Sequence, residues 1–146
     1  MKNRIQYFTL TFVVCFLLFN TVVFAQEEEQ PHVFVVVTWR TVMPEDGNAA
    51  ERDSLLLEWV EAQKSNEKVL SSKNLRHRFG NDSHDWVVIS EYASFADIAE
   101  AGKISQELTK KRWPDEKERQ EFFNQLGKYF DGHSDEIFTG VPKFDK

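Results

Sequence analysis

Apolar residues in this chain form strand-like and helix-like stretches in turn. From Val33 the sequence reads VFVVVTWRTV, which is β-branched and aromatic and apolar at five consecutive positions. A strand that is apolar on both faces is usually central in its sheet and covered on both sides. The segment WVVISEY, residues 86–92, has the same character. The chain is therefore predicted to contain two central strands.

Three stretches have helical spacing of their apolar residues. Residues 49–68 carry leucines, a tryptophan and a valine on one face and charges elsewhere, as in an amphipathic helix. Ser94 is a suitable N-cap for a second helix, and Asp97 three residues later completes a variant of the capping box. A third helix is predicted to begin around Pro114, with the proline in its first turn, and to end at Asp131-Gly132.

Two further strands complete the pattern. The second half of residues 69–79 alternates in polarity and is predicted to be a strand, joined by a short hairpin connection at residues 80–83. Residues 136–141 form a last short strand that Pro142 ends. The order β-α-β-β-α(α)-β predicts a ferredoxin-like α+β fold, with a four-stranded antiparallel sheet and helices on one face.

The twin strands VFVVVTW and WVVISEY, the capped helix beginning SFADI and the closing strand DEIFTGV resemble the dimeric α+β barrel superfamily over residues 32–141. In that superfamily two such sheets pack face to face and enclose a cavity. Its members include cofactor-independent monooxygenases, haem-degrading enzymes, lactone isomerases and proteins with no known activity. The resemblance implies a fold and a homodimer, and it selects no chemistry. A dimer would also cover the second apolar face of the two strands, which one layer of helices cannot reach.

Residues 1–25 are typical of a secretory signal peptide. Lys2 and Arg4 precede a mostly apolar run, and Val23-Phe24-Ala25 provides small residues for cleavage before Gln26. The run approaches the length of a membrane span, but polar residues interrupt it. We therefore expect an exported protein, periplasmic or extracellular in a bacterial envelope, with a disordered lead-in at 26–31 and one domain at 32–146.

Composition excludes several classes of function for the mature chain. The only cysteine, Cys15, lies in the segment expected to be removed, so no disulfide or thiol nucleophile is expected. The formal charge is −6 for the whole chain, and removal of Lys2 and Arg4 makes it −8. Such an acidic protein is repelled by nucleic acid and by anionic membrane surfaces. The expected partners are a second copy of the chain and a small apolar or anionic ligand.

The sheet face opposite the helices is the expected place for a pocket. Alternation puts Phe34, Val36, Thr38 and Arg40 on one face of the first strand. If that face coincides with the one formed by Trp86, Val88, Ser90 and Tyr92, polar groups cluster near one mouth, where His77 could join them. The predicted lining is then Thr38, Arg40, His77, Trp86, Ser90 and Tyr92. In the opposite register, Trp39, Val87, Ile89 and Glu91 line the pocket instead.

These side chains have a catalytic and a structural interpretation. Arg40 would bind a carboxylate or enolate-like oxygen, and Tyr92 or His77 could relay a proton. The plainer interpretation is that Arg40 and Tyr92 are polar strand ends and that the remainder is dimer core, and we prefer it.

Histidines and carboxylates near residues 82–85 and 133–136 offer metal ligands, because imidazole and carboxylate at short spacing bind zinc, iron or manganese. Their spacing matches no established signature such as HExxH, and both segments are predicted to be turns. Haem with His77, His84 or His133 as axial ligand is a further alternative that nothing selects. No cofactor or metal is therefore expected.

Two functions remain open. The first is an exported homodimer that binds a small molecule or serves a structural role. The alternative is a cofactor-independent monooxygenase or isomerase that uses Arg40, His77 and Tyr92. No constellation of residues requires catalysis, so binding is preferred. A cavity that reaches His77 or Tyr92 would favour the enzyme, and a barrel filled by Trp86 and Phe34 would favour the structural role.

Overall fold

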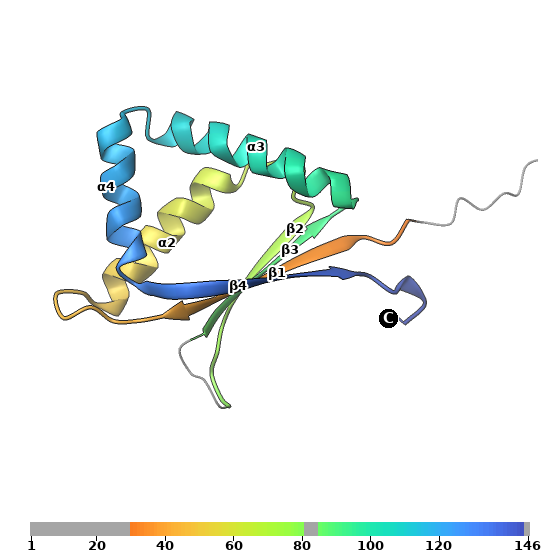
Figure 1. Ribbon diagram of the computed structural model, residues 1–146, viewed down its shortest axis with the longest axis horizontal. Coiled ribbons are helices and arrows are strands. Elements are labelled where there is room, and N and C mark those ends of the chain that lie inside the picture. Colours follow the sequence, from red (N-terminus) through yellow and green to blue (C-terminus); the bar gives the residue numbers. More distant parts are fainter. Residues whose placement is uncertain (1–29, 81–84, 145–146) are drawn as a thin grey trace, which may run out of the picture.

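The computed structural model describes residues 30–80 and 85–144 (Figure 1). The expected signal peptide and cleavage site, most of the lead-in, and Asp82 and His84 lie outside the described residues. No helix in the described ranges is long and apolar enough to cross a membrane. The elements are strands β1 (Val33–Thr41), β2 (Ser71–Arg76), β3 (Asp85–Tyr92) and β4 (Phe130–Thr139), helices α2 (Ala49–Gln63), α3 (Phe95–Arg112) and α4 (Glu116–Gly127), and the short 3-10 helix η1 (Pro142–Phe144).

The four strands form one sheet in the order β2-β3-β1-β4, and every neighbouring pair is antiparallel. The two strands predicted to be central, β1 and β3, are the central ones. All three helices lie on the same side of the sheet (Figure 1). The predicted ferredoxin-like α+β fold is confirmed.

The register of β1 and β3 decides which side chains face the helices. Trp39 is paired with Trp86 and Val37 with Val88. Directly opposed residues lie on the same face of a sheet, and Trp39, Trp86 and Val88 line a cavity together with residues of α2 and α4. The helix-facing surface therefore carries the odd-numbered residues of β1 and the even-numbered residues of β3. The open surface carries Phe34, Val36, Thr38, Arg40, Val87, Ile89 and Glu91.

Each long helix begins at a polar cap that satisfies a free backbone N–H group. The Asn48 side chain accepts from the N–H of Glu51 at 2.9 Å, and Asp115 likewise caps α4. Ser94 accepts from the N–H of Asp97 at 3.3 Å, as the sequence predicted. Pro114 precedes the cap of α4 and is not in its first turn.

The best-buried apolar cluster lies among the helices. Trp113 and Phe122 stack with ring centroids 4.1 Å apart and pack with Leu126. In the sheet, by contrast, most described side chains of β1 and β3 are only half-buried on both faces, and Val33, at 7% exposure, is the one buried side chain among them. The helices therefore do not close tightly over the sheet, and none of the described helices covers its far face.

The end of the chain differs from the sequence-based expectation. Helix α4 ends at Gly127, and β4 already begins at Phe130, so Asp131-Gly132 lies inside a strand. Opposite β1, the register of β4 shifts between Trp39 and Thr41, and Gly132 has φ +116°. A β-bulge thus absorbs one extra residue. The pair Asp131-Gly132 resembles the end of a helix. The helix was therefore expected to continue to this point, and the strand was expected to begin only at residue 136.

Helix α2 is also shorter than expected, because it ends at Gln63 rather than at residue 68. The following turn is tied to α3 by Asn66, which is 5% exposed. The Asn66 amide donates to the carbonyl oxygen of Ala101 and to Oγ of Ser105, both at 2.9 Å. A tertiary contact therefore ends the helical stretch where periodicity alone would extend it.

Candidate functional site

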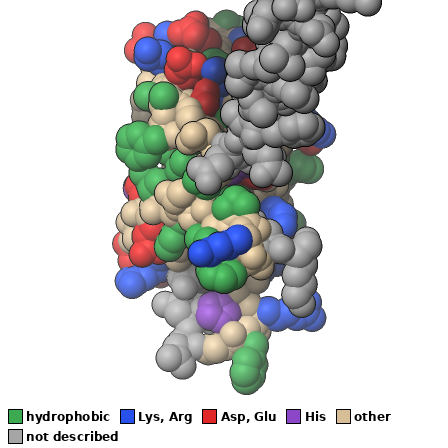
Figure 2. Space-filling view, turned by 90° about the vertical axis from the view of Figure 1, so that its right-hand side faces the viewer, with side chains coloured by type: hydrophobic (Ala, Val, Ile, Leu, Met, Phe, Trp, Pro, Cys, Tyr) green, Lys and Arg blue, Asp and Glu red, His purple; other side chains and the backbone are tan. Residues whose placement is uncertain are grey.

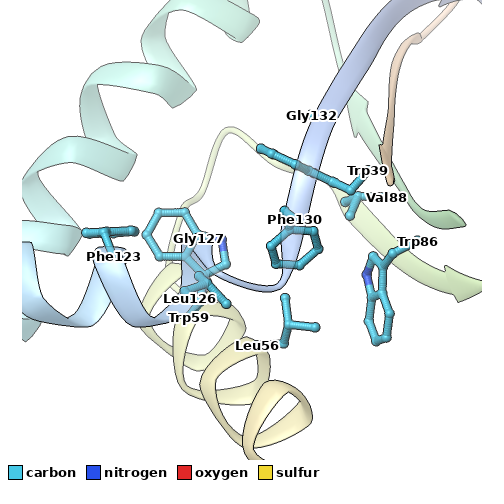
Figure 3. Close-up of a pocket in the computed structure, with 10 residues that line it drawn as sticks. All are labelled: Trp39, Leu56, Trp59, Trp86, Val88, Phe123, Leu126, Gly127, Phe130 and Gly132. Carbon is cyan, nitrogen blue, oxygen red and sulfur yellow. The ribbon is translucent and has the colours of Figure 1, made fainter. Parts of the chain in front are cut away.

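Large aromatic side chains stand between the sheet and the helices. The side chains of Trp39 and Trp86 lie next to each other on the helix-facing surface of the sheet, and Trp59 of α2 lines the same space. The layers form a partly open cavity of about 320 Å³ there (Figure 3), called the aromatic cavity below. Its lining residues are Trp39, Leu56, Trp59, Trp86, Val88, Phe123, Leu126, Gly127, Phe130 and Gly132.

The aromatic cavity offers stacking surfaces and no charge, because no ionisable side chain is among its lining residues. Trp39 contacts Phe130 edge to face with centroids 5.4 Å apart, and Trp59 contacts Phe123 at 5.2 Å. The indole N–H of Trp86 donates to Oδ1 of Asn74 at 3.3 Å, so this polar group is already paired. A cavity of this size and lining suits a small, flat, apolar molecule.

A second cavity of about 510 Å³ adjoins the aromatic cavity, since Trp59 and Val88 line both. We call it the polar cavity. Its sheet wall carries the side chains of Ser72, Ser90 and Tyr92, and its helix wall includes Gln63, Asn66 and Ser105. The space between the layers is therefore apolar toward one end of the strands and rich in hydroxyl and amide groups toward the other.

A third hollow, also about 320 Å³, opens beside the β-bulge, and Gly132 lines both it and the aromatic cavity. The ring of His133 packs against Trp39 with centroids 4.3 Å apart. Nδ1 of His133 lies 3.1 Å from Oδ1 of Asp135. This polar crevice is lined by Thr38, Arg40, Asp131, Gly132, His133 and Ser134.

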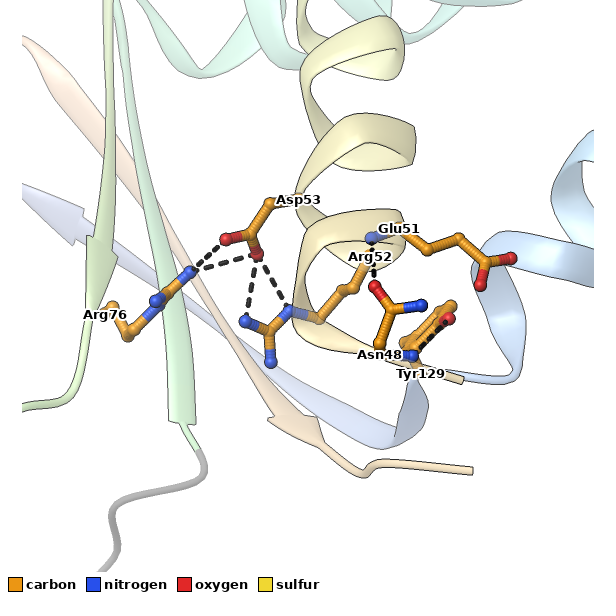
Figure 4. Close-up of polar contacts among 6 residues, drawn as sticks. All are labelled: Asn48, Glu51, Arg52, Asp53, Arg76 and Tyr129. Carbon is orange, nitrogen blue, oxygen red and sulfur yellow. Dashed lines mark hydrogen bonds and ion pairs between the residues drawn. The ribbon is translucent and has the colours of Figure 1, made fainter. Parts of the chain in front are cut away.

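A carboxylate between two arginines ties β2 to α2 beside the aromatic cavity (Figure 4). Arg76 donates to both oxygens of Asp53, at 3.0 and 2.9 Å, and Nε of the buried Arg52 donates at 3.0 Å. Burial acts to raise the pKa of Asp53, but the hydrogen bonds from Arg76 and Arg52 prevail and lower it. The Arg76 guanidinium lies 5.3 Å from the centroid of the Trp86 ring. This network therefore helps to position one wall of the cavity.

A separate polar group lies at one end of the open face. Glu91 accepts from the Ser71 hydroxyl at 2.5 Å, and its other oxygen lies 2.6 Å from Nδ1 of His32. The hydrogen bond from Ser71, and then that to His32, lower the pKa of Glu91. Glu91 is directly opposite Phe34 of β1. It belongs to the open face and does not line the cavities between sheet and helices.

The register separates the residues that were expected to share one mouth. Thr38 and Arg40 are on the open face, whereas Ser90 and Tyr92 face the helices. Thr38 lies opposite Val87 and Tyr92 opposite Val33, so the two pairs are also at opposite ends of the strands. The predicted cluster is therefore wrong. The alternative set fails as well, because Trp39 faces the helices while Val87, Ile89 and Glu91 do not.

The six residues of the predicted lining are distributed over three hollows. Trp86 lines the aromatic cavity, Ser90 and Tyr92 line the polar cavity, and Thr38 and Arg40 line the polar crevice. His77 lines none of these in the described part of the chain, and its Nε2 lies 2.6 Å from the carbonyl oxygen of Phe79. Ligand binding by any of the six stays a prediction.

Several lining residues were not recognised as site residues from the sequence. Leu56 and Trp59 were assigned to the apolar face of the first predicted helix, and Phe123 and Phe130 lie within the third predicted helix. The only available signal was the unusual number of aromatic side chains, with 4 Trp and 13 Phe in the chain. That signal indicates a large apolar volume and does not show whether the volume is filled.

The metal-ligand candidates are spread along β4 rather than gathered in a turn. His133 and Asp135 are both in the strand, so the turn predicted over residues 133–136 is wrong. Among residues 30–80 and 85–144, no group of three or more His, Cys, Asp or Glu side chains is placed to hold a metal ion.

The sheet order and the one-sided helix layer define a protein of the ferredoxin-like α+β class, with an apolar cavity between its layers. No protein-family model matches the sequence, and no curated protein does. Solved structures are similar to this chain in fold. The resemblance to the dimeric α+β barrel superfamily is thereby confirmed at the level of the fold.

Three of these structures show the extent of the similarity. A NIPSNAP family protein of unknown function from Agrobacterium tumefaciens is 16% identical, with 78% of this chain and 92% of that chain covered and a TM-score of 0.57. A protein from Caulobacter crescentus with a proposed role as an antibiotic biosynthesis monooxygenase is 18% identical, with 77% and 92% covered and a TM-score of 0.50. A dimeric protein of unknown function and ferredoxin-like fold from Bacteroides fragilis is 11% identical, with 74% and 95% covered and a TM-score of 0.45.

Proposed function

We propose that this chain is a homodimeric binding protein for a small, mostly apolar molecule, held between the sheet and the helices of each subunit. The aromatic cavity carries this proposal, because about 320 Å³ lined by aromatic, aliphatic and glycine residues remains open. The cavity is partly open, so its aromatic and aliphatic walls are exposed to water, which is unfavourable. A ligand that fills it would remove this apolar surface from water, and this gain supports a binding function.

The apolar residues on the open face of the sheet support the proposed dimer. Phe34, Val36, Val87 and Ile89 lie on this face, and none of the described helices covers them. Phe138, opposite Phe34 on β4, is 49% exposed. Contiguous apolar surface on a sheet face usually marks an interface.

The occupant of this face is a second copy, because the face is complementary to itself. Its centre is apolar, Arg40 lies at one end of β1 and Glu91 lies at the other end. A twofold axis in the plane between the sheets and perpendicular to the strands brings the Arg40 end of one copy over the Glu91 end of the next. Phe95 and Phe144 are further exposed hydrophobic side chains. Figure 2 shows one side of the molecule, on which hydrophobic and charged side chains are interspersed.

Sedimentation velocity at micromolar concentration tests the dimer. Val36→Lys places a charge in the middle of the open face and should give a monomer, whereas the wild type should sediment as a dimer. Gln106→Lys adds the same charge at an exposed position of α3 and should stay dimeric. A monomeric wild type would refute the pairing and leave the cavity proposal standing.

Binding of N-phenylnaphthylamine, a neutral fluorescent aromatic probe, tests the aromatic cavity. Leu56→Trp fills the cavity and should weaken binding at least roughly tenfold. Leu57→Trp makes the same change at the next position, where the side chain is 62% exposed, and should bind like the wild type. Circular dichroism would show that both variants fold. Equal affinity in all three proteins would show that the probe does not enter this cavity.

A second candidate function is a cofactor-independent monooxygenase or isomerase that works in the polar crevice next to the aromatic cavity. His133, which lines this crevice, favours it, because Asp135 holds Nδ1 while the imidazole packs on Trp39, which leaves Nε2 for proton transfer. Oxygen uptake with neutral polycyclic phenols, present in the wild type and lost in His133→Gln, would support this function. Turnover that is unchanged in His133→Gln would remove His133 from it.

We also propose that the protein is exported and cleaved after Ala25, leaving a single domain at residues 32–146. The basic start, the apolar run and the small residues at the cleavage site support this proposal. Intact-mass measurement of the protein from the envelope fraction of its host should give a chain that begins at Gln26. A chain that retains residues 1–25 in the cytoplasmic fraction would refute export.

A further inference from the structure

Hydroxyl groups with unused hydrogen-bonding capacity line the sheet wall of the polar cavity. Ser72 and Ser90 are directly paired across β2 and β3, and Tyr92 follows on the same face of β3. Ser90 and Tyr92 are half-buried. Within the described ranges, none of the three side chains makes a hydrogen bond. Three neighbouring hydroxyls can therefore donate to, or accept from, a molecule in the cavity.

The helix wall of this cavity carries an unpaired acceptor. Nε2 of Gln63 donates to Oγ1 of Thr109 at 3.1 Å, and the Thr109 hydroxyl donates its own proton to the carbonyl oxygen of Ser105 at 2.7 Å. Thr109 therefore cannot donate to Gln63, so the amide cannot be reversed. Oε1 of Gln63 is left buried and without a partner in the described part of the chain. A buried acceptor in this state is unfavourable. Because Oε1 is closed off from the cavity, the hydrogen-bonding groups considered for a ligand are the three hydroxyls of the sheet wall.

Charge is nearly absent from both cavities. Among the described residues, no ionisable side chain lines the aromatic cavity. Within the same part of the chain, Lys64 is the only charged residue that lines the polar cavity, and its ammonium group is paired with Glu61 at 3.1 Å. An anion would enter without a free cation to receive it, and a cation would enter without a carboxylate. Burial of an unpaired charge is strongly unfavourable, so the lining selects for neutral molecules.

We propose that the ligand is an uncharged amphipathic molecule. Its flat apolar part lies in the aromatic cavity, and a hydroxyl or carbonyl group lies against Ser72, Ser90 and Tyr92. Trp59 and Val88 line both cavities and set the two parts side by side, so that one molecule spans them. This inference rests on the proposed binding function and narrows it to neutral ligands with one polar end, excluding the anionic ligands that the sequence left open.

Three fluorescent naphthalene probes test the inference. N-phenylnaphthylamine is neutral and has no carbonyl group, its sulfonated analogue anilinonaphthalene sulfonate adds a charge to the same skeleton, and the naphthyl ketone prodan adds a carbonyl whose emission moves to the blue when hydrogen bonds to it are lost. In the wild type, the sulfonate should bind at least roughly tenfold more weakly than its neutral parent.

The variants remove the hydroxyls without changing the aromatic cavity. In the double variant Ser72→Ala and Ser90→Ala, prodan should bind roughly 3- to 30-fold more weakly with blue-shifted emission, while N-phenylnaphthylamine binds as before. Tyr92→Phe alone should weaken prodan in the same direction and serves if the double variant folds poorly. Ser134→Ala removes a strand serine that faces away from the polar cavity and should leave both probes unchanged.

The outcomes separate this inference from the proposed function. Unchanged prodan affinity and emission in the serine and tyrosine variants, with N-phenylnaphthylamine still bound, would overturn the polar-end assignment and leave the aromatic cavity as a binding site. Equal affinity for the sulfonate and its parent would overturn the preference for neutral ligands. Failure of the wild type to bind N-phenylnaphthylamine would refute the binding function, and the ligand class would fall with it.

Discussion

Asn66 connects the turn after α2 to the middle of α3, and replacing it with alanine should be costly. Its side chain is 5% exposed and makes three hydrogen bonds. The amide nitrogen donates to the carbonyl oxygen of Ala101 and to Oγ of Ser105, both at 2.9 Å, and Oδ1 accepts from the N–H of Lys68 at 3.2 Å. A net contribution of about 0.5–1.5 kcal/mol for each bond gives a loss of roughly 1.5–4.5 kcal/mol in the free energy of unfolding.

Urea denaturation followed by tryptophan fluorescence measures this loss. The transition should move to lower urea with an unchanged slope, because the surface exposed on unfolding stays the same. Asn66→Asp keeps the size of the side chain and the acceptor but removes both donors. It should lose at least as much stability as the alanine variant, because a carboxylate would then face the carbonyl oxygen of Ala101.

Ser65→Ala is the matched control, since Ser65 is the exposed neighbour in the same turn. Its effect should stay within about 0.5 kcal/mol. If Asn66→Ala costs no more than this control, the three hydrogen bonds do not stabilise the fold. If Asn66→Asp is as stable as the wild type at neutral pH, the amide donors are not what holds the turn to α3.

Three further predictions concern stability. Gly102 lies inside α3 where an added Cβ meets nothing, so Gly102→Ala should raise the free energy of unfolding by roughly 0.5–1 kcal/mol in urea denaturation, whereas Gly132→Ala, at φ +116°, should lower it. Phe122→Ala should cost roughly 3–5 kcal/mol in the same assay, because its ring is 8% exposed and stacked in the helical core, and a cost below about 1 kcal/mol would contradict the packing described. The pKa values of Glu91 and Asp97 lie below their ordinary values of 4.5 and 3.8. Both carboxylates therefore stabilise the fold at a pH above these ordinary values, and the contribution is lost as the pH falls through their lower pKa values in the folded protein. Thermal melts on acidification should show this loss, and a Glu91→Gln variant whose melting temperature falls as steeply as that of the wild type would contradict it.

The elements of the fold could be predicted from the sequence because they depend on neighbours along the chain. The β-branched and aromatic runs VFVVV and WVVIS predict strands, and a serine three residues before an acidic residue predicts the helix start at Ser94. Both signals arise within a few residues, and the structure contains the elements that they predict. Their order limited the fold to the ferredoxin-like plan, which is why the topology was correct although several element ends were misplaced.

The site depended on contacts that no local pattern contains. Trp39 and Trp86 share a face only because odd-numbered residues of β1 meet even-numbered residues of β3. Since side chains alternate with a period of two, one residue of slip reverses every assignment, and the expected grouping of Thr38 with Ser90 made that error. The bulge at Gly132 likewise exists only because β4 has one residue more than β1 at that point.

The chain itself thus specifies strands with two apolar faces, helices with defined starts, and an acidic composition with a single cysteine. Which aromatic rings meet, and whether the space between the helices and the sheet is filled or open, is settled when the layers pack. Packing depends on distances between residues that are far apart in sequence, such as Leu56 and Trp86. The periodicity of the sequence carries no information about such distances. The cavity between sheet and helices is for that reason a property of the assembled layers.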